Sequence, residues 1–201
     1  MLICLPYHSA LPVNYADLAK SIIRVGTNPN HTLAVISLRS DDEGAFHFST
    51  SLSDYFGRHI RSSMEDQPEQ PMMTANRFYL EAVRIFKKYK PSSQEAEHSP
   101  MMIADPTYQP VTPRWLDELQ SDYFRSGAPR VFGNFKETEP PMTVGPLILS
   151  REFVDTCTLA DFLPPNVHWR NYLAWELLKS SVKAAGIGSH DSAVLAPQFN
   201  I

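Results

Sequence analysis

The stretch at residues 101–116 constrains the fold more than any other part of the chain. Residues 101–104 form a short apolar run bounded by turn-forming residues, a pattern typical of a buried β-strand. Asp105 follows this run directly, and three prolines then precede Trp115 and Leu116, which open an amphipathic helix. In an open α/β sheet, ligands bind in the crevice beyond the carboxyl ends of the strands. The stretch therefore predicts a strand that places Asp105 at the edge of a binding crevice.

Asp105 has two interpretations at this point. A carboxylate at the end of a central strand can bind a hard cation and, through the cation, an anionic ligand. Aspartate before proline is also common in turns, where the side chain accepts a hydrogen bond from the backbone that follows. The residue pattern alone leaves both open.

Two apolar runs earlier in the chain have the pattern of parallel strands. Residues 1–5 form a continuous apolar run and residues 32–38 a mostly apolar one, as expected for strands that are buried on both faces. Between them, residues 15–23 carry apolar side chains at three- and four-residue spacing, and Asn14 is well placed as the N-cap of that helix. This strand–helix–strand unit predicts a right-handed parallel crossover.

The remaining segments alternate between helical and extended patterns. The four-residue spacing of Leu52, Phe56 and Ile60 predicts a helix, and a further helix is expected to start at Thr74. Two more strands are expected at residues 130–135 and 143–149, and a last helix at 167–178. The predicted fold is therefore a single α/β domain, Rossmann-like, with a mostly parallel central sheet flanked by helices.

Composition excludes several classes of protein. Hydrophobic residues make up 43% of the chain, charged residues 20%, and the net charge is −4, so there is no global electrostatic footprint for nucleic acid. The two cysteines, Cys4 and Cys157, have no metal-binding spacing and fit a reducing compartment. No apolar run approaches the ~20 residues of a membrane span, and no signal peptide is apparent. We therefore expect a cytoplasmic protein.

The stretch around Asp105 resembles the metal-binding segment of GT-A-type glycosyltransferases, and in particular small viral and bacterial members. In that group the segment reads apolar-Glu-Pro-Asp, followed after a proline by Gly-Trp-Leu-Asp. The matching residues here are Asp105-Pro106-Thr107 and Arg114-Trp115-Leu116-Asp117. Thr107 replaces the second acid of the family pattern. A hydroxyl brings no charge, so metal affinity is expected to be weaker or the metal dispensable.

The resemblance implies a nucleotide-sugar-dependent transferase whose nucleotide-binding half is residues 1–100 and whose metal and acceptor half is residues 101–201. It places the nucleotide against the loops after the first two strands and the diphosphate at the start of the helix near residue 76. The matching residues are His8, Ser9, Asp41, Asp42, Asn76 and Arg77. For Asp41 and Asp42, a solvated turn is the competing interpretation.

The resemblance also implies a divalent cation, Mn²⁺ or Mg²⁺, on the donor diphosphate. Its expected ligands are Asp105 with Thr107 and, from the tail of the chain, His190. If the reaction inverts the anomeric centre, the expected base that deprotonates the acceptor hydroxyl is Glu176 or Asp191. Glu176 could instead form a salt bridge, and His190 could be a surface-loop histidine.

The acceptor stays open between a glycan, a protein and a hydroxymethylated base of phage DNA. A second class of function also stays open, because Thr107 interrupts the acid pair. In that class the chain is a catalytically silent GT-A-like protein that binds a nucleotide, or a structural or interaction protein such as a virion component.

Overall fold

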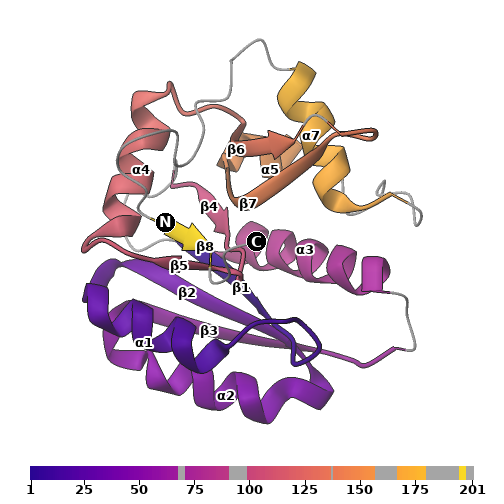
Figure 1. Cartoon of the computed structure of the whole chain (residues 1–201). Coiled ribbons are helices and arrows are strands. Elements are labelled where there is room, and N and C mark those ends of the chain that lie inside the picture. Colours follow the sequence, from indigo (N-terminus) through magenta and orange to yellow (C-terminus); the bar gives the residue numbers. More distant parts are fainter. Residues whose placement is uncertain (68–70, 91–98, 137, 157–166, 180–194, 198–201) are drawn as a thin grey trace.

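The structure is a computed structural model that describes residues 1–67, 71–90, 99–136, 138–156, 167–179 and 195–197 (Figure 1). Its helices are α1 (Tyr15–Val25), α2 (Asp42–Ser51), α3 (Pro71–Lys88), α4 (Trp115–Arg125), α5 (Arg151–Thr156) and α7 (Trp169–Lys179). Its strands are β1 (Leu2–Tyr7), β2 (Asn28–Leu38), β3 (Phe56–Met64), β4 (Met101–Ile103), β5 (Tyr108–Pro110), β6 (Val131–Lys136), β7 (Met142–Leu149) and β8 (Leu195–Pro197).

Six of these strands form the central sheet, in the order β3-β2-β1-β4-β7-β6. Strands β3, β2, β1 and β4 are parallel, whereas β7 and β6 run antiparallel to their neighbours. A separate antiparallel pair joins β5 to β8 near the end of the chain. The central sheet confirms the predicted α/β fold with a mostly parallel sheet.

The strand order reverses between β1 and β4. From β1 the chain moves outward through β2 to β3, and α3 then returns it to the opposite side of β1 as β4 (Figure 1). The connections on the two sides of this point leave in opposite directions, which opens a crevice beyond the carboxyl ends of the two strands. The topology therefore specifies where a ligand would bind.

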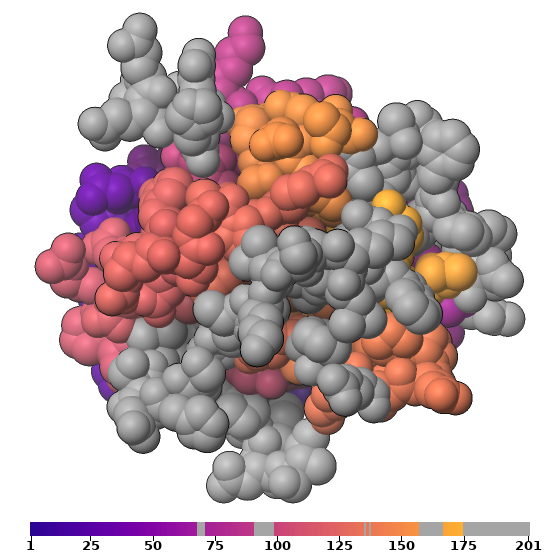
Figure 2. All heavy atoms as spheres, turned by 90° about the horizontal axis from the view of Figure 1, so that it is seen from above, coloured from indigo at the N-terminus to yellow at the C-terminus, as the bar shows by residue number. Residues whose placement is uncertain are grey.

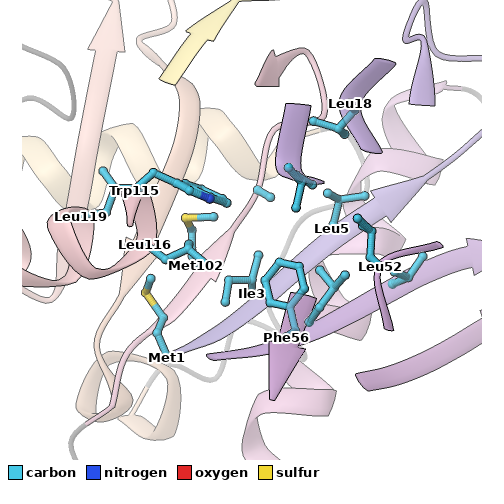
Figure 3. Packing of buried hydrophobic residues seen from close by; sticks show 14 of the residues in the cluster. Met1, Ile3, Leu5, Leu18, Leu52, Phe56, Met102, Trp115, Leu116 and Leu119 are labelled. Carbon is cyan, nitrogen blue, oxygen red and sulfur yellow. The ribbon is translucent and has the colours of Figure 1, made fainter. Parts of the chain in front are cut away.

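Each face of the sheet has its own hydrophobic core. On one face, α1, α2 and α4 pack against alternate side chains of β1 and β2. Figure 3 shows this cluster, in which Ile3 and Met102 of neighbouring strands lie close to Phe56 and Leu116. On the other face, α3, α5 and α7 cover the intervening side chains, such as Leu2 and Ile36. The alternation along each strand produces three layers, helices–sheet–helices.

Local sequence signals explain the first helix. The Asn14 side chain accepts a hydrogen bond from the Asp17 N–H at 3.2 Å, as predicted for the N-cap of α1. Gly26, at φ +97°, ends the helix in a backbone conformation that L side chains rarely adopt.

The helix predicted from Leu52, Phe56 and Ile60 is wrong. The helix of this region is α2, which ends at Ser51, and residues 56–64 form the edge strand β3. A four-residue spacing fits both a helix and a strand, because four is also a multiple of the strand period of two. The overlooked signal was Gly57, where an added Cβ would lie 1.9 Å from the Pro29 carbonyl oxygen of β2.

The start of α3 also differs from the prediction. The helix begins at Pro71 rather than near Thr74, so Asn76 and Arg77 lie inside it and not at its first turn. Proline suits the first position of a helix because its missing N–H has no intrahelical acceptor there. None of the helices in the described ranges is both long and apolar enough to cross a membrane.

The buried His31 predicts how stability depends on pH. His31 is 3% exposed, and its Nε2 lies 2.9 Å from an Asp117 carboxylate oxygen. Burial lowers the pKa of His31 below its usual 6.5, although the bond to Asp117 opposes this shift. Below pH 6.5, His31 therefore binds a proton in the unfolded chain but stays neutral in the folded chain. Stability must fall as the pH falls through this range.

The unfolding free energy of the parent protein should decrease between about pH 7.5 and about pH 5.5. We predict that this decrease is about 1 kcal/mol smaller in His31→Gln. Urea unfolding of parent and variant at both pH values measures the difference. His47→Gln, at an exposed position of α2, is the control and should leave the difference unchanged. An unchanged pH dependence in His31→Gln would contradict the assignment.

Candidate functional site

A cleft of about 440 Å³ opens beyond the carboxyl ends of β1 and β4. It lies on the sheet face covered by α3 and α7, at the point where the strand order reverses. Most of its wall is apolar, and the side chains with titratable or hydroxyl groups that line it are Cys4, His8, Thr74, Tyr79, Asp105, Thr107, His168 and Arg170. A mainly apolar cleft with a few convergent polar groups is typical of a small-molecule site.

His8 lines one rim of the cleft, and two other predicted nucleotide-binding residues, Ser9 and Asp41, contact one another beside it. His8 Nδ1 lies 2.7 Å from Asp41 Oδ2, and the Ser9 N–H donates to the same oxygen at 3.2 Å. Burial would raise the pKa of Asp41, but the hydrogen bonds from Ser9 and His8 outweigh it and hold the pKa below its usual value. The Asp41 side chain is 6% exposed, so it is not part of a solvated turn. It holds the loop after β1 against the loop after β2.

Asp42, the fourth residue predicted at this rim, has a different environment. It is exposed in the first turn of α2 and accepts a hydrogen bond from Ser37 Oγ at 3.3 Å. A carboxylate there complements the positive end of the helix dipole. The structure therefore brings Asp41, but not Asp42, against His8.

Asp105 lies at the opposite rim and caps a turn. Its Oδ1 accepts hydrogen bonds from the Thr107 N–H at 3.0 Å and the Thr107 hydroxyl at 2.5 Å. The Tyr108 N–H donates to the Asp105 carbonyl at 3.0 Å. The turn interpretation is thus confirmed, and it is compatible with the other one, because the same carboxylate lines the cleft.

The second oxygen of Asp105 binds an arginine that sequence reasoning missed. Arg170 Nη2 donates to Asp105 Oδ2 at 2.9 Å, and the two side chains are 16% and 15% exposed. Arg170 Nη1 donates to the carbonyl oxygens of Gly145 at 2.9 Å and Thr143 at 3.3 Å. Burial lowers the pKa of Arg170 and Asp105 opposes the shift, but a guanidinium stays charged in proteins. A fixed cation therefore lines the cleft.

His168 is a second residue that sequence reasoning missed. Its Nδ1 accepts a hydrogen bond from the Arg170 N–H at 3.1 Å and so caps the start of α7. Burial, and then the charge of Arg170, lower the pKa of His168 below its usual value. Because Nδ1 is an acceptor in a neutral ring, Nε2 carries the proton. His168 can therefore donate a hydrogen bond but cannot accept a proton at Nε2.

The arrangement of Asp105 and Thr107 does not fit a divalent cation. Both Asp105 oxygens accept hydrogen bonds, and the Thr107 hydroxyl donates its proton to one of them. A positive charge, that of Arg170, already lies beside the carboxylate. The described part of the chain contains no group of three or more His, Cys, Asp or Glu side chains that could hold a metal. His190, the remaining predicted ligand, lies outside the described residues.

Asn76 and Arg77 have structural partners. The Asn76 amide donates to the Val167 carbonyl at 2.8 Å and accepts from the Trp169 N–H at 2.9 Å, which ties α3 to the start of α7. Arg77 Nη2 donates to the Glu65 carbonyl at 2.7 Å. Their predicted role at a diphosphate stays a prediction.

The side chains of the two predicted catalytic carboxylates lie outside the described part of the structure. Glu176 belongs to α7, but its side chain lies outside the described set. Asp191 also lies outside the described residues. Their role as the acceptor base stays a prediction.

Fold and cleft together define an α/β protein with a cleft at the switch point of its sheet. No family model matches the chain, and no curated protein matches it. Among solved structures, the chain is similar to mouse xyloside xylosyltransferase 1 in its apo form, with 14% sequence identity and a TM-score of 0.43. The similarity covers 87% of this chain and 74% of the mouse chain.

We predict that Asn76→Ala destabilises the fold by about 2–3 kcal/mol, because it leaves the Trp169 N–H and the Val167 carbonyl without their partner. Chemical denaturation measures this loss. The exposed Asn30→Ala should change the unfolding free energy by less than about 0.5 kcal/mol. If Asn76→Ala lowered the unfolding free energy no more than Asn30→Ala does, the two hydrogen bonds of Asn76 would contribute little to stability.

Proposed function

We propose that the chain is a nucleotide-sugar-dependent glycosyltransferase of the GT-A type. The observation that carries the proposal is the cleft at the switch point between β1 and β4, lined by His8 on one rim and Asp105 on the other. These residues belong to the two segments that resemble the family. The likeness of the segment around Asp105 supports the choice of this family among α/β proteins.

In the proposed reaction an acceptor hydroxyl attacks the anomeric carbon of the donor, and a nucleoside diphosphate leaves. Negative charge develops on the leaving diphosphate, so the site needs fixed positive charge or N–H donors there. Arg170 and the first turn of α3 line the cleft and meet this need. Glu176 or Asp191 is the proposed acceptor base. A glycan, a protein or a modified DNA base remains the proposed acceptor.

A catalytically silent nucleotide-binding protein is the second candidate. It is favoured by one observation: both oxygens of Asp105 are engaged by Thr107 and Arg170. Such a protein would keep the cleft and bind a nucleotide without turning it over. Turnover separates it from the enzyme.

We predict that a screen of nucleotide-sugars identifies one that raises the melting temperature and is hydrolysed or transferred. Ligand at ~100 times its Kd stabilises the folded state by about 2.7 kcal/mol, which a thermal-shift assay resolves easily. Release of nucleoside diphosphate measures turnover. Binding without turnover would select the silent protein, and no binding by any nucleotide or nucleotide-sugar would overturn the proposal.

We further predict that Thr74→Phe abolishes this ligand-induced shift by filling the cleft. Thr74 lines the cleft from the first part of α3. Lys87→Phe, on an exposed position near the other end of the same helix, is the matched control and should keep the full shift. An intact shift in a folded Thr74→Phe would place the nucleotide elsewhere.

A further inference from the structure

Arg170 is the only lysine or arginine among the described residues that line the cleft. Three protein oxygens hold its guanidinium, from Asp105, Thr143 and Gly145. These bonds use Nη1 and one N–H of Nη2. Nε and the second N–H of Nη2 have no partner in the described ranges. Nε and Nη2 share one edge of the guanidinium, the edge that can bind two oxygens of a phosphate at once.

The ion pair with Asp105 and the ring of Trp169, whose centroid lies 4.6 Å from Arg170 Cζ, stabilise this buried cation but do not satisfy all of its donors. Removing a charge from water costs several kcal/mol, and one carboxylate and two carbonyl groups do not use all five N–H donors of arginine. The remaining donors belong to a side chain that lines the cleft. The first turn of α3 also faces this cleft, and helix N-termini favour anions. The positive features converge on one place.

We propose that Arg170, and not a divalent cation, binds the diphosphate of the ligand, so that binding is independent of metal. The proposal rests on the proposed function for the identity of the ligand, and it changes the expected role of Asp105. Asp105 becomes a positioning residue that orients the guanidinium through Oδ2, while Thr107 holds its Oδ1. The missing second acid at position 107 is then no defect, because the site needs no second charged ligand.

The two arrangements make opposite predictions for Asp105. If Asp105 binds a metal, Asp105→Asn weakens binding of the diphosphate. If Asp105 only orients Arg170, its negative charge opposes the incoming anion. The amide removes that repulsion, and its one oxygen accepts from Arg170 when its NH2 group takes the place of Oδ1, with loss of the bonds from Thr107. We expect Asp105→Asn to bind the anion on the order of tenfold more tightly.

The test measures binding of UDP, GDP and inorganic pyrophosphate by calorimetry, in EDTA and in Mn²⁺. We expect equal affinity in both conditions for the parent protein. Arg170→Met should lower the affinity ~10- to 100-fold, and Arg170→Lys should restore part of it. Arg151→Met is the matched control, since Arg151 also holds two carbonyl oxygens, of Phe86 and Tyr89, but lies outside the cleft lining. It should bind as the parent does.

The outcomes separate this inference from the proposed function. Binding of a nucleoside diphosphate only with Mn²⁺, lost in Asp105→Asn, would overturn the inference and keep the function. Metal-independent binding of pyrophosphate without binding of either nucleotide would keep the anion site and count against the function. If no probe binds in either condition, both are overturned. If Arg170→Met fails to fold, Asp105→Asn still decides, because its affinity rises or falls.

Discussion

The ion pair between Asp105 and Arg170 holds together the wall of the cleft, where we propose that the ligand binds. Asp105 follows β4, Arg170 lies in the first turn of α7, and its guanidinium donates to two carbonyl oxygens of β7. Because both side chains are largely buried, loss of either leaves an uncompensated charge, which typically costs 3–5 kcal/mol. The pair therefore fixes the geometry of the cleft wall and, at the same time, sets its charge.

The position of this pair follows from the sheet order. Strands β1 and β4 are neighbours, yet the chain reaches β4 only after β2, β3 and α3. Loops that follow neighbouring parallel strands leave the sheet at the same edge, so His8 and Asp105 face one crevice although they are far apart in the chain. Tyr79 of α3 stacks on Trp169 of α7, with ring centroids 5.1 Å apart, and both side chains line the cleft.

Much of the fold could be predicted because local signals agreed with the tertiary structure. The apolar runs of β1 and β2, the Asn14 cap and the turn at Asp105 each follow from a few adjacent residues. The exception was β3, whose four-residue apolar spacing fits two periods and whose edge position is set by pairing with β2. Only those site residues that directly follow a predicted strand, such as His8 and Asp105, could be predicted from the sequence.

Arg170 could not be predicted as a site residue because it lies 65 positions from Asp105 in the sequence. Its only local signal was a charge beside the aromatic residues that open a helix. The family resemblance instead directed attention to a metal at Asp105, whose two oxygens are bonded by Thr107 and Arg170. The same contacts assign the positive charge of the cleft to a side chain.

The most direct test is a crystal structure of the protein with UDP and Mn²⁺ both present. We predict phosphate oxygens within hydrogen-bonding distance of Arg170 Nε and Nη2, with the Asp105–Arg170 pair intact. The anomalous signal of manganese should then be absent at Asp105. A manganese ion bound between Asp105 and the diphosphate, with Arg170 displaced, would contradict the account.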